Sequence, residues 1–270
     1  MMVKALWNSF LLVVLFVMAQ IVAGASAYIL SGAGDASNLS LPPDILGGTM
    51  VVAYVVLLLM LWVTKIIRRR PLTPQHPVVP KGATWGIFGT LSIAIGLGFL
   101  LTPLHLDDGG SLAMFDGMKA SPVCILLLTI VGPLTEEVVF REGVQRMLLR
   151  GGMGPWAAVL VASAFFALIH GNLAQAFPAF VLGAMLGVLY LRTGDIRLCL
   201  PAHILNNVVA LVGLYYPVLD EAPDALPLWA SLLVGSALVV FGGILLRTLR
   251  TPRVLSPSDT FDSFEKTAES

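Results

Sequence analysis

The side chains of this chain that could do chemistry gather in three short stretches of otherwise apolar sequence. The first stretch is rich in acids, and the other two each pair a histidine with asparagine. Together they are Glu136, Glu137, Arg141 and Glu142; His170 and Asn172; and His203, Asn206 and Asn207. A glutamate and a histidine around a water molecule can act in general base catalysis. A second histidine and an amide can donate to a developing oxyanion.

The composition indicates that these polar groups lie inside a membrane. Hydrophobic residues make up 57% of the 270 residues and charged residues only 12%, whereas a soluble domain carries about 25% charged residues. This excludes a soluble globule, a disordered chain and a basic nucleic-acid-binding protein. A charged group inside a membrane span costs at least ~2.5–3.5 kcal/mol, so each one is a candidate functional residue.

Eight apolar stretches approach the length of about 20 residues that a membrane span needs. They are residues 5–30, 47–67, 84–104, 121–139, 156–170, 177–191, 198–215 and 226–246. The sequence therefore predicts an all-α, polytopic membrane helical bundle of about eight transmembrane helices. The fifth and sixth stretches are short, and the uncharged loop 171–176 between them is expected below the outer surface, packed in protein or facing water.

Basic residues predict the orientation of these spans, because cytoplasmic loops hold the excess of Lys and Arg. With the N-terminus inside, 15 of the 16 Lys and Arg residues fall on the cytoplasmic side and only Lys119 falls outside. This predicts that both termini are cytoplasmic. Cys124 and Cys199 then lie on opposite sides and are expected to stay reduced. The first segment also fits a signal peptide cleaved after 25–27, but its apolar run is long and favours a retained helix.

A glycine-rich turn sets the level of the first two polar stretches. Residues 151–155 read Gly-Gly-Met-Gly-Pro, which predicts an antiparallel hairpin of the fourth and fifth helices. Glu136 lies 14 residues before Arg150 and His170 lies 14 residues after Trp156, so both are ~21 Å from the tip. Arg141, Arg146 and Arg150 indicate that the tip of the hairpin projects into the cytoplasm. Glu136 is therefore expected one or two turns below the membrane surface, with His203 at a similar depth.

Spacing within each helix distinguishes the polar residues. Glu137 and Arg141 are four residues apart on one face, which favours an ion pair. Glu136 points about 100° away from Glu137 and is free to face a cavity. His203 and Asn207 are one turn apart and can address the same ligand.

Three motifs in this order resemble the CPBP family. Residues 136–141 read E-E-x-x-x-R, residues 166–170 read F-x-x-x-H, and residues 203–207 read H-x-x-x-N. The family comprises the type II CAAX prenyl proteases and bacterial relatives, including bacteriocin-processing and immunity proteins. The resemblance covers roughly residues 121–214, and the other helices match only in being hydrophobic.

The resemblance implies an intramembrane endopeptidase with a cavity open to the cytoplasm. It implies that Glu136 activates water and that His170 helps to hold this water. His203 and Asn207 would stabilise the oxyanion. The motif positions of Glu137, Arg141 and Phe166 imply supporting roles. Phe166 is expected to pack beside His170.

The resemblance leaves metal dependence open. Glu136, His170 and His203 could supply three zinc ligands with water as the fourth, but the same residues work as a metal-free base and oxyanion site. We favour the metal-free interpretation. Two other functions also stay open: a transporter that uses a Glu/His proton relay, and a non-catalytic immunity or scaffold protein. Transporters usually show repeats and midplane sites, whereas this cluster is unrepeated.

Other candidate motifs carry less weight. Residues 32–35 read G-x-G-D, as in aspartic intramembrane proteases, but they fall in an outer loop without a second intramembrane aspartate. The chain has no H-E-x-x-H or G-x-S-x-G motif. Asn172 and Asn206 are expected to be structural, and His76 and His105 lie away from the cluster. Gly183 and Gly187 are expected to allow close helix packing.

These observations predict the organisation of the chain. Residues 1–120 hold three helices and a proline-rich cytoplasmic loop at 68–83, residues 121–215 form the catalytic core, 216–250 form the eighth helix, and 251–270 form a disordered tail. The expected location is a bacterial cytoplasmic membrane. The expected partners are a peptide or membrane-protein substrate and the lipid bilayer, with no nucleic acid. The sequence does not define the substrate or the oligomeric state.

The orientation can be tested by cysteine accessibility. A cysteine introduced near Pro74 should react with a membrane-impermeant thiol reagent only after the membrane is opened, because the proline-rich loop is predicted to be cytoplasmic. Reaction in sealed cells would contradict the orientation with both termini inside.

Overall fold

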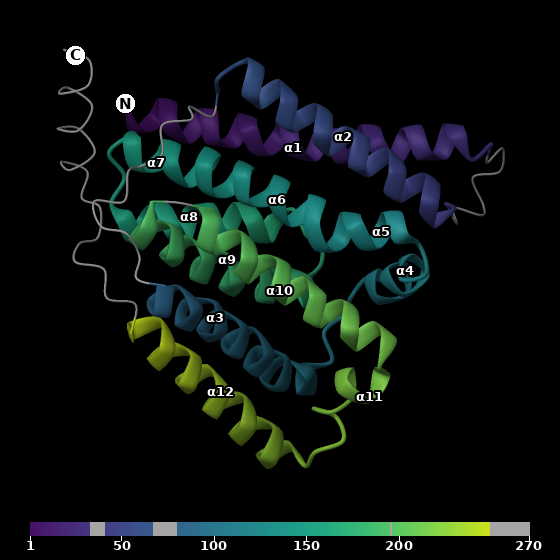
Figure 1. Ribbon diagram of the computed structural model, residues 1–270, viewed down its shortest axis with the longest axis vertical. Helices are drawn as coiled ribbons and strands as arrows, with labels where there is room; N and C mark the ends of the chain where they lie inside the picture. Colours follow the sequence, from purple (N-terminus) through teal and green to yellow (C-terminus); the bar gives the residue numbers. More distant parts are fainter. Residues whose placement is uncertain (33–40, 67–79, 195, 249–270) are drawn as a thin grey trace.

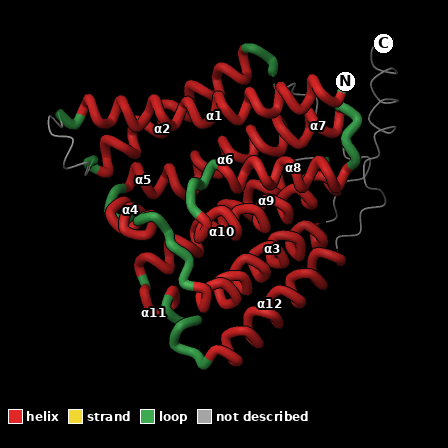
Figure 2. The backbone as a smooth tube through the Cα atoms, turned by 180° about the vertical axis from the view of Figure 1, so that it is seen from behind, coloured by secondary structure: helices red, strands yellow, loops and turns green. Residues whose placement is uncertain are grey.

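The computed structural model describes residues 1–32, 41–66, 80–194 and 196–248. Helices and their connections make up these residues, and no strand occurs among them (Figures 1 and 2). The predicted tail at 251–270, most of the proline-rich loop 68–83 and most of the G-x-G-D motif lie outside the described residues. The structure confirms the predicted all-α class.

The helices follow one another with short connections. Their bounds are α1 Met2–Leu30, α2 Pro43–Val63, α3 Pro80–Leu101, η1 Thr102–Leu104, α4 Ser111–Met118, α5 Pro122–Leu126, η2 Leu127–Val131, α6 Gly132–Glu137, η3 Val138–Gln145, α7 Arg146–Arg150, α8 Pro155–Leu168, α9 Leu173–Thr193, α10 Ile196–Tyr215, α11 Pro217–Asp220 and α12 Leu228–Thr248. Seven helical segments of the described chain are long and apolar enough to cross a membrane, and α8 is a shorter apolar helix. The protein is thus a multi-pass membrane protein.

The segments α5 to α7 form one continuous helical rod from Pro122 to Arg150. The Ser121 hydroxyl caps its start by accepting from the Cys124 N–H. Pro133 has no N–H and cannot donate to the helix. The N–H of the preceding Gly132 donates to the Leu127 carbonyl, five residues back. The resulting wide π-helical turns of η2, and those of η3, lie on either side of α6, which carries both glutamates of the first motif. Such turns are frequent at functional sites.

The turns around α8 show which local predictions were right. The α7–α8 turn spans residues 151–154, as predicted from its glycines, and Gly152 has a positive φ of 89°. The predicted loop 171–176 and short sixth helix were wrong. Asn172 caps α9 by accepting from the Gln175 N–H at 2.9 Å, so α9 begins at Leu173 and runs for 21 residues.

The helices form layers with the long rod near the middle. In Figure 1, the α1–α2 pair lies above the rod, the α8–α10 group lies below it, and the α3–α12 pair lies at the far side. One buried cluster joins α1, α2, the rod, α8 and α9, with Phe16, Phe140 and Phe166 among its members. A second cluster joins α3, α9 and α10. The rod is therefore covered by helices from both halves of the chain.

Glycines bring α3 and α12 into close contact. A Cβ atom added at Gly242 would lie 2.5 Å from the Gly89 carbonyl oxygen, and one added at Gly96 would lie 2.8 Å from that of Gly235. Between these two crossings, the Ser92 hydroxyl donates to the Leu238 carbonyl at 2.8 Å. The absence of side chains at these glycines lets the two backbones touch, as is common between membrane helices.

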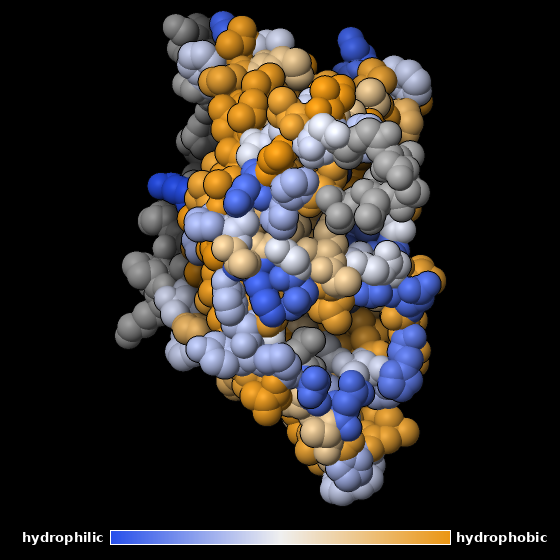
Figure 3. All heavy atoms as spheres, turned by 90° about the vertical axis from the view of Figure 1, so that its right-hand side faces the viewer, coloured by the Kyte–Doolittle hydropathy of each residue, from blue (hydrophilic) through white to orange (hydrophobic). Residues whose placement is uncertain are grey.

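Hydrophilic side chains gather at one end of the bundle, which Figure 3 views directly. Asp108 lies in the loop before α4, where the backbone N–H groups of Leu112 and Gly110 donate to its carboxylate and hold its pKa below the usual value. The Asn172 amide donates to the Ser111 hydroxyl at 2.9 Å. This bond ties the start of α4 to the turn between α8 and α9.

The close α3–α12 crossing predicts a difference between two adjacent glycines. Gly242→Ala should lower the melting temperature in detergent, because overpacking a close contact costs about 1–3 kcal/mol. Gly243→Ala is the matched control, since its added Cβ would meet nothing within 4 Å. Equal melting temperatures for the two variants would contradict the close contact.

Candidate active site

The Glu137 carboxylate is fully buried and holds two partners from different parts of the chain. Its Oε2 atom accepts from Nε of Arg141 at 3.1 Å, and the side chains of both residues have no solvent exposure. Its Oε1 atom accepts from Nδ1 of His203 at 2.9 Å. A buried carboxylate is costly unless it is paired and hydrogen-bonded. The predicted Glu137–Arg141 pair is confirmed, and the bond to His203 joins α6 to α10.

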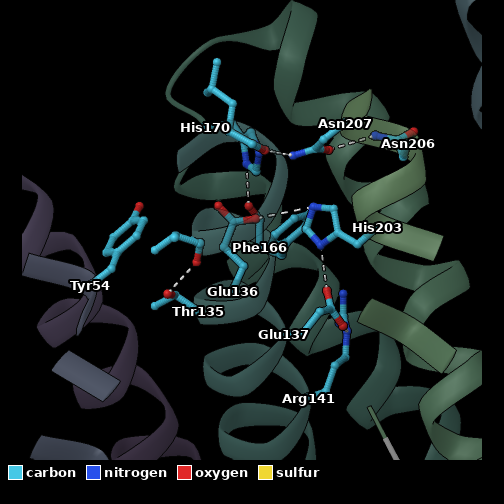
Figure 4. A network of polar contacts seen from close by, with 12 residues as sticks. Tyr54, Thr135, Glu136, Glu137, Arg141, Phe166, His170, His203, Asn206 and Asn207 are labelled. Atoms are coloured by element: carbon cyan, nitrogen blue, oxygen red, sulfur yellow. Dashed lines mark hydrogen bonds and ion pairs between the residues drawn. The ribbon is translucent and has the colours of Figure 1, made fainter. Parts of the chain in front are cut away.

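This bond sets the orientation of the His203 ring. Because Glu137 accepts at Nδ1, the other ring nitrogen, Nε2, faces the opposite way and lies 3.5 Å from Oε2 of Glu136. Figure 4 shows the ring of His203 between the two glutamates. The Glu136 side chain is 17% exposed and that of His203 only 3%. Glu136 can therefore meet a small molecule while its neighbours stay buried.

The Phe166 ring lies at the centre of the site. It contacts the rings of His170 and His203 edge-to-face, with centroid distances of 4.9 and 5.8 Å. It also contacts the ring of Phe140 at 5.2 Å, and the guanidinium carbon of Arg141 lies 5.7 Å from its centroid. Phe166 was expected only to pack beside His170. In the structure it contacts both histidines and the buried arginine, which fixes α8 against the rod and α10.

His170 lies in the turn that ends α8. Its Nδ1 atom is 2.8 Å from the Phe166 carbonyl oxygen. A carbonyl only accepts, so Nδ1 carries the hydrogen and Nε2 of the neutral ring is left as an acceptor. His170 is half-buried, and Figure 4 shows its ring on the side of the site where the Glu136 carboxylate lies.

The two asparagines of the third motif form a short chain of hydrogen bonds. The Asn207 amide donates to the Leu128 carbonyl at 2.9 Å, and the Asn206 amide donates to the Asn207 oxygen at 3.2 Å. Leu128 belongs to the π-helical segment η2. One N–H of Asn207 is therefore used to hold α10 against the rod, and its second N–H is available to another acceptor.

Small residues make room for this arrangement. A Cβ atom on Gly183 would lie 3.1 Å from Cδ1 of Phe166, and one on Gly187 would lie 3.0 Å from Val159. These contacts confirm the predicted close packing of α9 and show that it supports the Phe166 ring. Asn172 takes the structural role expected of it as the cap of α9.

The arginines of the rod are buried within the protein. Arg141 has no exposure and Arg146 has 2%. Nη1 and Nη2 of Arg141 have no hydrogen-bond partner among the described residues. Glu136 lies midway along the 29-residue rod, about 21 Å from either end at 1.5 Å per residue.

The sequence analysis missed a contribution from the N-terminal helices. Tyr54 of α2 lies within electrostatic range of Glu136, and Gln20 of α1 donates to its hydroxyl. Neither residue belongs to a motif. The one signal in the sequence is that both are polar side chains within long apolar helices.

Zinc ligation is the alternative interpretation of Glu136, His170 and His203. Among the described residues, no three His, Cys, Asp or Glu side chains are grouped so that they could hold a metal ion. Nδ1 of His203 is engaged by Glu137 and Nδ1 of His170 by a carbonyl. Both bonds leave Nε2 of the ring for water or a metal ion.

Comparison with known proteins matches the part of the chain that carries this site. Residues 119–209 match a family model described as "Type II CAAX prenyl endopeptidase Rce1-like". All three motifs lie inside that segment, on the rod, α8 and α10. This segment is similar to the CAAX prenyl endopeptidase family. The helices α1 to α4, α11 and α12 lie outside the matched segment.

A known protein is similar to this chain over a longer region. The Bacillus subtilis (strain 168) protein named "Putative membrane peptidase YdiL" is 25% identical over 150 residues, which are 53% of this chain. The chain covers 61% of the length of that relative. No solved structure gives a significant match.

The two adjacent glutamates of the site should respond differently to the same substitution. Glu137→Gln should lower the melting temperature, because removing one partner of a buried ion pair costs about 3–5 kcal/mol. Glu136→Gln, its matched control, should leave the melting temperature unchanged because Glu136 makes no ion pair with an arginine. Thermal unfolding of both variants in detergent measures this, and an equal stability of the two would show that Glu137 does not hold the bundle together.

Proposed function

We propose that this protein is an intramembrane endopeptidase that hydrolyses peptide bonds of membrane-associated or hydrophobic peptides. The observation that carries the proposal is the partly exposed Glu136 carboxylate, which faces a histidine held from behind by a buried Glu–Arg pair within the matched segment. An ionisable side chain within a membrane-spanning segment costs free energy of insertion, so such residues usually have a function. A chemical role for Glu136 explains why the segment carries this carboxylate.

In the proposed mechanism, Glu136 takes a proton from a water molecule. The oxygen of this water forms a bond to the carbonyl carbon of the peptide, and the carbonyl electrons move to its oxygen. Glu136 then passes the proton to the leaving amine, and the C–N bond breaks. Nε2 of the neutral His170 ring accepts from the same water and helps to orient it.

His203 and Asn207 supply donors for the oxyanion in this proposal. For His203 to donate from Nε2, both ring nitrogens carry hydrogen, and Glu137 accepts from the second one. Asn207 donates through the N–H that is not bonded to Leu128. Removing one such donor typically costs about 10²–10³ in rate. Glu137 and Arg141 act on the reaction only through the position of His203.

The substrate proposal follows from the names of the similar proteins. The matching family is described as a CAAX prenyl endopeptidase and the relative as a membrane peptidase. We therefore propose a peptide or membrane-protein substrate reached from the lipid bilayer, in a bacterial cytoplasmic membrane, with both termini of the enzyme inside. Prenylated C-terminal peptides and unmodified hydrophobic peptides are the two classes to compare.

We propose that the reaction uses no metal, because Glu136, His170, His203 and Asn207 can act as a base and an oxyanion site without one. Cleavage should therefore persist after treatment with a strong chelator. Zinc bound one-to-one, and lost together with activity in His170→Ala, would reverse this part of the proposal.

Reconstituted protein in liposomes can test the proposal with two defined probes. These are a quenched fluorescent peptide with a farnesylated C-terminal CaaX sequence and an unmodified hydrophobic peptide library read by mass spectrometry. Glu136→Gln should abolish cleavage of any peptide that the wild type cleaves, because it keeps the size of the side chain and removes the base. Asn207→Ala should keep some activity. His105→Ala, in an outer loop, is the control and should cleave normally.

Three results distinguish the competing functions. Near wild-type cleavage by Glu136→Gln would exclude a glutamate mechanism. No cleavage of either probe by the wild type, together with proton-coupled solute uptake that needs Glu136, would favour a transporter. A function in cells that tolerates Glu136→Gln would favour a scaffold.

A further inference from the structure

Tyr54 is buried on a helix that is otherwise largely open to lipid. Its exposed fraction is 3%, whereas its neighbours Val52, Val55 and Val56 are 62%, 44% and 58% exposed. The hydroxyl of a buried tyrosine usually has a hydrogen-bond partner. The burial therefore indicates a specific role for the inward face of α2 at this residue.

Two residues of α1 fix the Tyr54 side chain. The ring of Phe16 stacks on it, with a centroid distance of 5.4 Å and an interplanar angle of 17°. The Gln20 amide donates to the Tyr54 hydroxyl oxygen at 2.9 Å. Because this bond uses the oxygen as acceptor, the O–H hydrogen of Tyr54 stays available for a different acceptor.

The hydroxyl held in this way faces the candidate active site. Tyr54 and Glu136 interact electrostatically, and Figure 4 shows Tyr54 on the side of the Glu136 carboxylate opposite His203. No hydrogen bond joins the two side chains directly. The arrangement leaves a donor and a carboxylate facing the same small space, which is the environment that a bound water molecule requires.

A continuous row of aromatic rings connects Tyr54 to the histidines. Phe16 stacks on Tyr54 and contacts the ring of Phe140 at 5.8 Å, and Phe140 contacts the Phe166 ring that touches both histidines. Interiors packed in this way transmit small displacements rather than absorbing them. The position of Tyr54 is therefore fixed relative to the motif residues although it lies outside the matched segment.

We propose that Tyr54 binds the water molecule that Glu136 deprotonates, and that Gln20 is a positioning residue which acts through Tyr54. This inference rests on the proposed function and adds a residue to its site. The Tyr54 O–H donates to the oxygen of the water, the water gives its proton to Glu136, and Tyr54 keeps its own proton throughout. The α1–α2 pair then completes an active site whose other residues all belong to the matched segment.

The first test compares the kinetics of conservative variants of the reconstituted protein. The substrate is whichever of the two peptide probes the wild type cleaves. Tyr54→Phe removes only the hydroxyl, so kcat should fall about 10- to 100-fold, while KM and the melting temperature stay unchanged. Gln20→Met should cause a smaller loss of kcat, because the hydroxyl remains but is no longer held. Tyr28→Phe, also on the N-terminal pair, is the matched control and should behave as the wild type.

The second test needs no substrate. Dicyclohexylcarbodiimide modifies protonated carboxyl groups in apolar surroundings, and mass spectrometry can measure the modified fraction of Glu136. The water that Tyr54 holds donates to the Glu136 carboxylate, and loss of a donor to a carboxylate raises its protonated fraction. Tyr54→Phe should therefore increase the modification, whereas Tyr28→Phe should not. The other titratable groups around Glu136 stay the same in these variants: His203 of α10, His170 after α8, and Glu137 and Arg141 of the rod.

These tests separate the inference from the proposed function. Unchanged kcat and unchanged carbodiimide modification in Tyr54→Phe would overturn the role of Tyr54, as would a loss of activity matched by a lower melting temperature. A mature protein that begins after residue 27, and so lacks Gln20, would overturn the role of Gln20. Increased modification without cleavage of either peptide would support the placement of Tyr54 beside Glu136, and the proposed function alone would fail.

Discussion

The need to neutralise one buried carboxylate organises this molecule. Glu137 has no contact with water, so its charge is tolerated only because Arg141 and His203 donate to its two oxygens. Arg141 comes from the same helix one turn later, whereas His203 must be brought from α10. The bond to His203 in turn directs the other ring nitrogen towards Glu136. The bond between Glu137 and His203 therefore both stabilises the bundle and orients the His203 ring towards Glu136.

Local sequence predicted the parts of the site that depend on helical spacing. The spacing of Glu137 and Arg141 indicated their ion pair, and the glycines before Pro155 indicated the α7–α8 hairpin. The order of the three motifs also indicated the family. Contacts between helices were not predicted, because an apolar segment carries little information about which neighbour it faces. The His203–Glu137 bond and the Phe166 contact with His203 are of this kind.

Other features depend on specific side-chain contacts. Glu137 and Glu142 on the rod pair with Arg141 and Arg146, and both arginines are buried. The loop before the sixth helix was predicted too long, because the capping bond of Asn172 starts α9 earlier. Tyr54 was missed because its position opposite Glu136 is set by the packing of α1 on α2 and of both on the rod.

The separation of the Glu137 partners along the chain has a consequence for biosynthesis. His203 lies 66 residues after Glu137, and at a translation rate of about 5–20 residues per second it emerges roughly 3–13 s later. During that interval the rod must leave the translocon with Glu137 bonded to Arg141 alone. Arg141, one helical turn away, is thus the partner that neutralises Glu137 while the helix is being made. His203 becomes the second partner only after α10 has been synthesised. Assembly of the reactive groups would then be the last event of membrane integration.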